Sequence, residues 1–244
     1  MSANGAGERA ALGGRSRRTA AFVAVGVGVA HAVLFLLAYW LLTSTPGAHG
    51  SDEEIVAFYA SGNGHQMVLV GLYVMPFAGI AFLWFSVALR AWIRAYSPRE
   101  SELFSGVQLV SGILYVALFF AGAAAYSVMA VSVELSDAPV DPVVARQFPL
   151  YGGTLLMVFA MRMAAMFVFT TSRIGRITRA LPRWFTFVGL CVGLFLLFSA
   201  SYSRALVLVF PLWLLVLCAL LLVRVRRLPQ DPADARGDAR ASPG

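Results

Sequence analysis

The sequence contains no lysine, only two cysteines and three histidines, and only twelve acidic residues in a chain of 244. Cys191 and Cys218 lie in long apolar runs, where a free cysteine acts as a small apolar side chain. A zinc site or a similar metal centre needs three or four ligands at suitable spacing, and neither HExxH nor CxxC occurs. We therefore expect no disulfide framework, no metal and no cofactor.

The acidic residues are also missing from the interior of the long apolar runs, because all twelve lie in tails, in linkers or at run ends. A proton relay through a membrane commonly uses buried carboxylates, and this sequence offers none. The GxSxG motif of serine hydrolases and the phosphate-binding P-loop are absent as well. We predict that the protein is not an enzyme.

Apolar residues dominate what is present: 59% of the chain is hydrophobic, 13% is charged, and the mean hydropathy is +0.77. A helix needs about 20 mostly apolar residues to cross the roughly 30 Å hydrocarbon core of a bilayer. The sequence therefore predicts an all-α fold, a polytopic membrane bundle of six transmembrane helices. The expected spans cover about residues 20–42, 67–89, 104–132, 151–172, 184–203 and 205–223.

Two tails flank this transmembrane domain, which we place at residues 19–226. The tails, 1–18 and 227–244, are rich in Gly, Ala, Ser, Pro and mixed charges and show no apolar period. Such compositions are typical of disordered segments, because they cannot bury enough apolar surface to offset the entropy of ordering. We expect both tails to be disordered.

The arginines predict the orientation of the spans. Two of the nineteen, Arg146 and Arg204, fall on one side of the expected spans, and sixteen fall on the other. Cytoplasmic loops carry the excess of positive charge in membrane proteins. We therefore expect a multi-pass protein of the plasma membrane with both termini in the cytoplasm. The net charge of +7 then faces anionic lipid headgroups, and no nucleic-acid partner is expected. The sixteen are Arg9, Arg15, Arg17, Arg18, Arg90, Arg94, Arg99, Arg173, Arg176, Arg179, Arg183, Arg224, Arg226, Arg227, Arg236 and Arg240.

The two exterior linkers carry signals for short amphipathic helices. In GSDEEIVAFYASGNG, Ser51 and Glu54 have the spacing of a capping box, and Gly62 can end the helix. In the second linker Asp141 can cap a helix that has Pro142 at its first position. The similar order of elements also suggests an internal duplication of 51–133 and 141–203. In the first helix the apolar face consists of Ile55, Phe58 and Tyr59.

Small and cyclic residues predict how some spans pack and bend. Gly189 and Gly193 form a GxxxG motif that lets another helix approach span five closely, and packing within the bundle is favoured over dimerisation. Pro76 and Pro211 are expected to kink spans two and six, because proline cannot donate a helical hydrogen bond.

One permanent charge lies inside an expected span: Arg162, in MVFAMRMAAMFVF. A central arginine opposes insertion by about 2.5–3.5 kcal/mol, while each Leu, Val or Phe favours it by about 0.3–0.6 kcal/mol, so span four inserts marginally. We expect Arg162 to point into the bundle. Counted from the inner ends of their spans, His31 and Tyr115 lie at the same depth, so the expected partners of Arg162 are His31, Tyr115 or a freed backbone carbonyl.

Two interpretations of this trio remain open. Arg162, His31 and Tyr115 either form a polar pin that fixes the helix register, or bind an anionic ligand that supplies the missing negative charge.

Three stretches resemble a group of actinobacterial multi-pass membrane proteins of unknown function: SDEEIVAFYASGNGHQMVLVGLY, FLWFSVALR and MRMAAMFVFTTSRIGRITRALPRWFTFVG. The likeness covers roughly residues 20–225. It implies a plasma-membrane location in a high-GC bacterium, and it supplies no catalytic residue.

These observations favour a non-enzymatic membrane protein with a structural or partner-binding role. The expected partners are membrane lipids and, beyond them, another membrane protein or a second copy in a homo-oligomer. The alternative is a small transporter, or a lipid- or anion-binding protein that uses Arg162. A water-accessible cavity that reaches Arg162 would distinguish the alternative from the first interpretation.

Overall fold

The computed structural model describes residues 3–42, 50–96, 102–136, 138–199 and 207–227. Every regular element in this part of the chain is a helix, which confirms the all-α class. The elements are α1 (Ala3–Leu41), α2 (Asp52–Ala60), α3 (Gly62–Leu69), η2 (Val70–Val74), α4 (Met75–Tyr96), α5 (Glu102–Ser136), α6 (Pro142–Thr154), η3 (Leu155–Ala160), α7 (Met161–Ile177), α8 (Arg183–Phe198) and α10 (Val209–Arg226).

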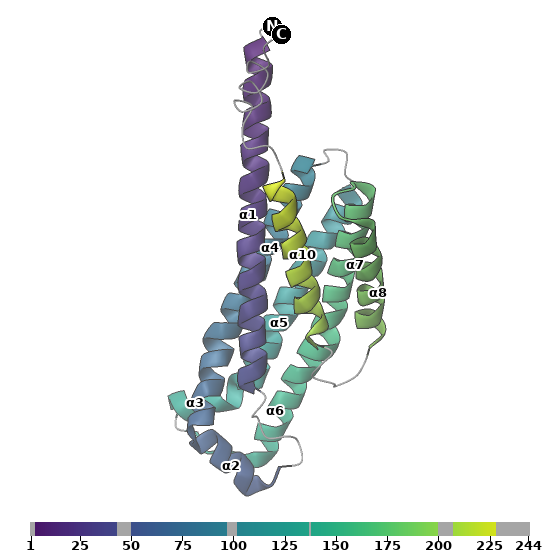
Figure 1. The fold of residues 1–244 in the computed structure, drawn as a ribbon. Coiled ribbons are helices and arrows are strands. Elements are labelled where there is room, and N and C mark those ends of the chain that lie inside the picture. Colours follow the sequence, from purple (N-terminus) through teal and green to yellow (C-terminus); the bar gives the residue numbers. More distant parts are fainter. Residues whose placement is uncertain (1–2, 43–49, 97–101, 137, 200–206, 228–244) are drawn as a thin grey trace.

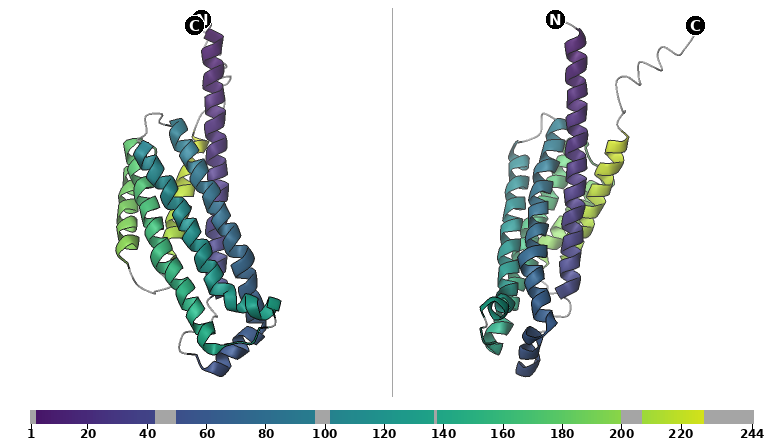
Figure 2. Two further views of the ribbon diagram at one scale, coloured as in Figure 1. Left: turned by 180° about the vertical axis from the view of Figure 1, so that it is seen from behind. Right: turned by 90° about the vertical axis from the view of Figure 1, so that its left-hand side faces the viewer.

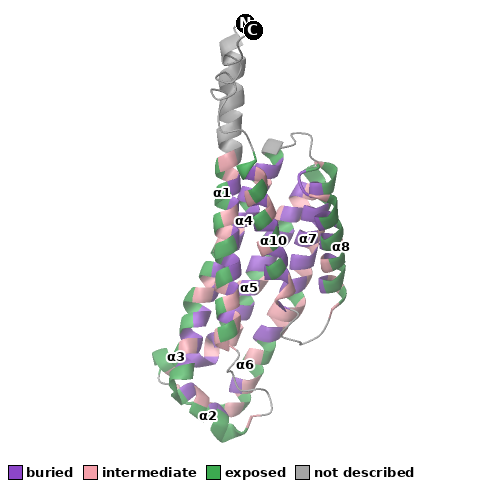
Figure 3. Cartoon of the chain, viewed as in Figure 1, coloured by how far each residue is buried: buried purple, intermediate pink, exposed green. Residues whose placement is uncertain are grey.

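The helices form an elongated bundle (Figures 1 and 2). Helix α1 packs along α4 and α10, α5 packs against α4, α6 and α7, and α8 lies against the outer side of α7. The short helices α2 and α3 lie at the end of the bundle opposite the α7–α8 turn (Figure 1). Buried residues follow the interior of this bundle, and exposed residues follow its outer surface (Figure 3).

Five helical stretches are long and apolar enough to cross a membrane: Arg18–Leu41, Gly62–Arg94, Glu102–Ser136, Pro142–Ile177 and Val209–Arg226. Helix α8 is apolar but has 16 residues. At 1.5 Å per residue it measures about 24 Å, which is less than the roughly 30 Å of hydrocarbon. The structure therefore supports a multi-pass membrane protein with five candidate spans, and the described part of the expected span 184–203 is the shorter helix α8.

Large apolar side chains cover the outer surface of the bundle. Trp84 is 62% exposed, Phe187 67% and Phe198 74%. Extended apolar surface of this kind is unusual on a soluble monomer, but it matches a lipid environment.

Two of the long stretches contain a π-helical segment, η2 in Gly62–Arg94 and η3 in Pro142–Ile177. Pro76 lies two residues after the end of η2, and its missing N–H explains why the regular ladder is interrupted there. The expected kink at Pro211 stays a prediction, because residues 200–206 lie outside the described residues and α10 begins at Val209. Pro211 thus falls in the first turn, where the N–H of a helical residue has no partner within the helix.

The N-terminal segment differs from the expected disordered tail, because α1 begins at Ala3. Its residues include Ala10, Ala11 and Leu12, which are strong helix formers, and the helix continues from them into the first apolar run. Residues 228–244 of the expected C-terminal tail lie outside the described residues.

Helices α2 and α6 begin where the capping signals place them. Helix α2 has the full capping box of Ser51 and Glu54, and Asp141 accepts hydrogen bonds from the first turn of α6. Ile55 and Tyr59 are buried as expected, and Phe58 is half-buried. The C-terminal cap of α2 is Ser61 rather than Gly62, because α3 begins at Gly62.

A second, smaller core holds these two helices on the bundle. The Tyr59 hydroxyl donates to the Ala145 carbonyl oxygen at 3.4 Å, and burial raises the pKa of Tyr59 to about 12. Arg146 donates to the Gly50 carbonyl oxygen at 2.8 Å and pairs with Asp52. The apolar members of this core are Ile55, Tyr59, Met67, Val68, Met129, Ala130 and Ala145.

The GxxxG motif of α8 packs within the bundle, as expected. A Cβ at Gly189 would lie 2.0 Å from the Ser172 Oγ, and one at Gly193 would lie 3.1 Å from the Phe169 ring, so both glycines face α7. These close approaches hold α8 against α7.

Candidate functional site

His31 and Tyr115 form a buried hydrogen-bonded pair at the centre of the bundle. The His31 Nδ1 lies 2.8 Å from the Ala78 carbonyl oxygen, and the Tyr115 hydroxyl lies 3.4 Å from the His31 Nε2. A carbonyl oxygen only accepts, so Nδ1 carries the hydrogen and Nε2 accepts from the tyrosine. The pair therefore links α1, α4 and α5 without placing a charge in the core.

Aromatic rings surround this pair. The His31 ring centroid lies 5.9 Å from that of Phe35, 5.0 Å from Phe82, 6.3 Å from Phe119 and 6.3 Å from Phe210. His31 itself is completely buried. Both ring nitrogens of His31 have a hydrogen-bond partner, so the pair is a fully hydrogen-bonded polar contact between helices in an apolar surrounding.

Contacts between α5 and α7 establish the depth of Arg162. The Gln108 Nε2 donates to the Thr171 Oγ1 at 2.7 Å, and a Cβ at Gly112 would lie 3.4 Å from the Phe167 ring. In this antiparallel register Tyr115 is level with the part of α7 next to Arg162. The depth estimated by counting residues therefore agrees with the packing.

Arg162 nevertheless points away from the pair. Phe167 faces the central cluster, with its ring 5.1 Å from that of Phe82. Arg162 lies five residues earlier on the same helix, which turns it by about 140° from the direction of Phe167. The structure thus brings His31 and Tyr115 together but leaves Arg162 apart from them.

The guanidinium of Arg162 uses a backbone carbonyl of its own helix instead, and this carbonyl is not a freed one, because it also accepts the Met161 N–H. Its Nη1 donates to the Val158 carbonyl oxygen in η3 at 3.1 Å, and the side chain is half-buried. Among the described residues no carboxylate pairs with it. The charge of Arg162 is therefore not neutralised by the described part of the chain.

Helix α8 ends close to the level of Arg162. Phe169, which meets Gly193 of α8, lies on the same face of α7 as Arg162, about two turns away. Continued along the antiparallel register of the two helices, this places Arg162 just beyond Phe198, where α8 ends. Within the described residues, α8 therefore does not extend along the part of α7 that carries Arg162.

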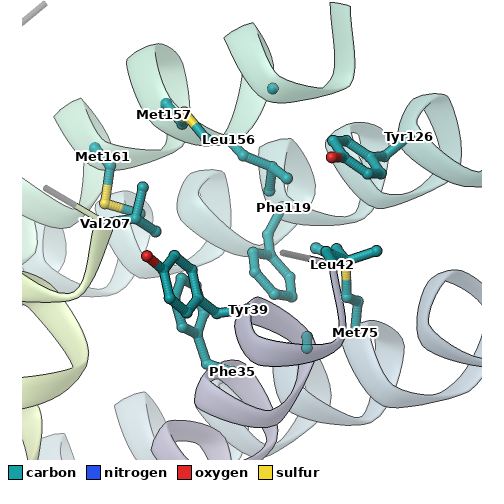
Figure 4. A pocket seen from close by; sticks show the side chains of 12 residues that line it. Phe35, Tyr39, Leu42, Met75, Phe119, Tyr126, Leu156, Met157, Met161 and Val207 are labelled. Atoms are coloured by element: carbon teal, nitrogen blue, oxygen red, sulfur yellow. The ribbon is translucent and has the colours of Figure 1, made fainter. Parts of the chain in front are cut away.

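A separate, apolar pocket lies on another side of α7 (Figure 4). It encloses about 80 Å³ and is partly open. Two of its lining side chains, Phe35 and Phe119, are also the neighbours of His31, so the bottom of the pocket meets the central cluster. The pocket is lined by Phe35, Ala38, Tyr39, Leu42, Met75, Phe119, Tyr126, Gly153, Leu156, Met157, Met161 and Val207.

The sequence analysis did not find this pocket, although Met157 and Met161 precede Arg162 in the stretch MVFAMRMAAMFVF. The lining residues come from α1, α4, α5, α6, η3, α7 and the residues before α10, and each is an ordinary apolar residue of its own span. Only the tertiary packing brings them together. A run of methionines beside an intramembrane charge was the available signal, because methionine suits irregular and adaptable surfaces.

Polar side chains in the half of the bundle near the α7–α8 turn were also missed. The Arg90 Nε donates to the Ser105 Oγ at 2.7 Å, and Gln108 joins Thr171 as described above. Within the described part of the chain, the Gln108 Oε1, Ser172 Oγ and Trp213 Nε1 are buried without a hydrogen-bond partner. No group of three or more His, Cys, Asp or Glu side chains comes together among the described residues.

No protein-family model matches the chain, and comparisons with curated proteins and with solved structures return no match either. The resemblance to actinobacterial multi-pass proteins therefore stays a prediction. What can be argued about function rests on the pocket, the central pair and the arginines.

Proposed function

We propose that the chain is a six-span protein of the plasma membrane with both termini in the cytoplasm. Five stretches are long enough to span, and α8 would be the sixth if the chain beyond Phe198 completes it. The described arginines other than Arg146 and Arg162 gather at the end of the bundle that holds the α7–α8 turn. The positive-inside rule supports placing this end in the cytoplasm.

This topology predicts the result of reporter fusions. Fusions at Gly62 and Asp137 should report the exterior, because an odd number of spans precedes each position. Fusions at Tyr96 and Gly175 should report the cytoplasm, because an even number of spans precedes each of them. Alkaline phosphatase and green fluorescent protein provide matched reporters for the two sides. A single reversed fusion would refute the six-span topology.

The geometry best supports a non-enzymatic role in binding a membrane lipid, and the apolar pocket is the observation that carries this proposal. Its lining is almost entirely apolar, and it lies among the apolar stretches that face the hydrocarbon. A cavity of about 150 Å³ with similar walls stays dry and binds benzene. The pocket here is smaller, at about 80 Å³, so it suits the end of an acyl chain rather than a headgroup.

Gly153 provides a way to fill the pocket without disturbing the fold. It lines the pocket, and a Cβ built on it meets nothing within 4 Å. Gly153→Leu should therefore place its side chain in the space that the acyl chain would take. We expect labelling of the α6 and α7 peptides by a phospholipid with a photoactivatable acyl chain to fall several-fold.

Gly26→Leu is the matched control for this experiment. Gly26 also lies in an apolar helix with nothing within 4 Å of its Cβ, but it does not line the pocket. Labelling of the same peptides should stay at the level of the unmodified protein in this variant. Equal labelling of all three proteins would show that the acyl chains do not enter the pocket.

A small transporter is the second candidate, supported by the two π-helical segments. Met75 directly follows η2, while Leu156 and Met157 belong to η3, and all three line the pocket. π-Helical turns occur often at functional sites, and transporters use interrupted helices at their binding sites. A cysteine at Phe35 that reacts with impermeant reagents from both sides of the membrane would favour transport, and one that reacts from the exterior alone would favour binding.

A further inference from the structure

A groove of about 500 Å³ lies between the α7–α8 turn and the last turns of α10. Leu181 and Pro182 line it on the side of the turn, and Leu220 and Val223 line it on the side of α10. Arg224 and Arg227 complete the lining. The groove thus combines an apolar wall with two permanent positive charges at the end of the bundle.

The turn beside the groove is held in one conformation. The Leu181 N–H donates to the Gly175 carbonyl oxygen at 3.3 Å, which closes the end of α7. Arg179 adopts a left-handed conformation with φ of 54°, a position where glycine is usual. The Arg224 Nη2 donates to the Arg179 carbonyl oxygen at 3.0 Å and ties α10 to this turn. The two walls of the groove are therefore fixed relative to each other.

We propose that this groove binds the headgroup of an anionic phospholipid. Its phosphate would lie against Arg224 and Arg227, and its acyl chains would run along Leu220 and Val223. Guanidinium groups match phosphate oxygens in geometry and charge, and basic pockets at the cytoplasmic ends of spans attract anionic headgroups. Among the described residues that line the groove, none is acidic.

The surroundings add to this attraction, because Arg176 and Arg183 flank the α7–α8 turn. The groove lies at the opposite end of the bundle from α2 and α3 and shares no lining residue with the acyl-chain pocket. This inference therefore goes beyond the proposed acyl-chain pocket, and it rests on the proposed topology only for the cytoplasmic position of this end of the bundle.

The substitution Arg227→Gln tests the proposal, and Arg226→Gln is its matched control. Both remove one positive charge from neighbouring positions, but only Arg227 lines the groove. Melting temperatures of the purified full chain should be measured in neutral detergent with added phosphatidylglycerol, phosphatidylcholine or inorganic phosphate. We expect phosphatidylglycerol alone to raise the melting temperature, and we expect Arg227→Gln to lose most of that rise while Arg226→Gln keeps it.

Three results would overturn the proposal. An equal loss of the phosphatidylglycerol effect in both variants would indicate a general charge effect. An equal rise of the melting temperature with phosphatidylcholine would show that the headgroup charge is not recognised, and an equal rise with inorganic phosphate would indicate a site for a free anion. Arg224→Gln is less suitable as the primary variant, because it also removes the bond to Arg179. Native mass spectrometry of bound phosphatidylglycerol gives the same comparison if a variant melts too early for a thermal shift.

Discussion

Gly152→Ala should destabilise the folded protein by about 3 kcal/mol, the upper part of the range for overpacked cores. A Cβ at this position would lie 2.7 Å from the Gly122 carbonyl oxygen and 2.7 Å from the Tyr126 backbone nitrogen, both in α5. These are backbone atoms, so no side-chain rotation can relieve the contact. The free energy of unfolding, measured by denaturation in mixed micelles, should show the loss directly.

The neighbouring glycine provides the control. A Cβ at Gly153 meets nothing within 4 Å, and alanine favours a helix over glycine by about 0.5–1 kcal/mol. Gly153→Ala should therefore leave the stability unchanged or raise it slightly. Equal effects of the two substitutions would show that α6 does not approach α5 in the way that the structure describes.

Much of the fold could be predicted because its signals are local. The apolar runs predicted helices at or near every position where the structure has a long one, and the spacing of Ser51 and Glu54 predicted the start of α2. Asp141 and Pro142 did the same for α6. Capping and hydropathy depend on residues that are close in the sequence, so no tertiary information was needed.

The close approach of α5 and α6 could not be predicted in this way. Gly122 and Gly152 are ordinary small residues in the sequence, and only the register of the two helices places one against the other. The pocket has the same origin, since its lining residues come from helices that are far apart along the chain. The end of α8 at Phe198 was missed although the next residues, SASYSR, are mostly small and polar.

The candidate site shows where residue counting stops being informative. Counting from the ends of the spans placed His31, Tyr115 and Arg162 at one depth, which agrees with the packing, but it expected His31 and Tyr115 to be partners of Arg162 rather than of each other. Depth along a helix does not determine the direction around it, however, and Arg162 faces away from the pair. Which face of α7 packs against α8 depends on the tertiary packing of the bundle and cannot be obtained by counting residues.

Arg162→Leu should favour membrane insertion of the segment 151–172 by about 3–4 kcal/mol, because a central arginine opposes insertion while leucine promotes it. The recorded hydrogen bond of Arg162 stays within its own helix, to Val158. Its removal therefore breaks no bond between helices of the described chain. A glycosylation-based insertion assay on the isolated segment should show the change, with Arg162→Gln giving an intermediate result.

Arg173→Leu is the control for this prediction. It makes the same chemical change on the same helix, but Arg173 is exposed near the end of α7, with its guanidinium 5.8 Å from the centre of the Phe104 ring. The effect on insertion should be much smaller there, because an arginine close to the interface can reach water. An equal gain at both positions would place Arg162 at the interface rather than in the membrane interior.

The stability of the whole protein then distinguishes the two interpretations of Arg162. If its only interaction is the bond to Val158, the melting temperature of Arg162→Leu in detergent should match or exceed that of the original protein, with and without anionic lipid. If an anion occupies the space beyond the end of α8, the original protein should gain stability from anionic lipid, and both Arg162→Leu and Arg162→Gln should lose that gain. Because Arg162 and Arg227 lie at different depths, Arg227→Gln should leave any stabilisation through Arg162 in place, and comparison of the two substitutions assigns the lipid effect to one site or the other.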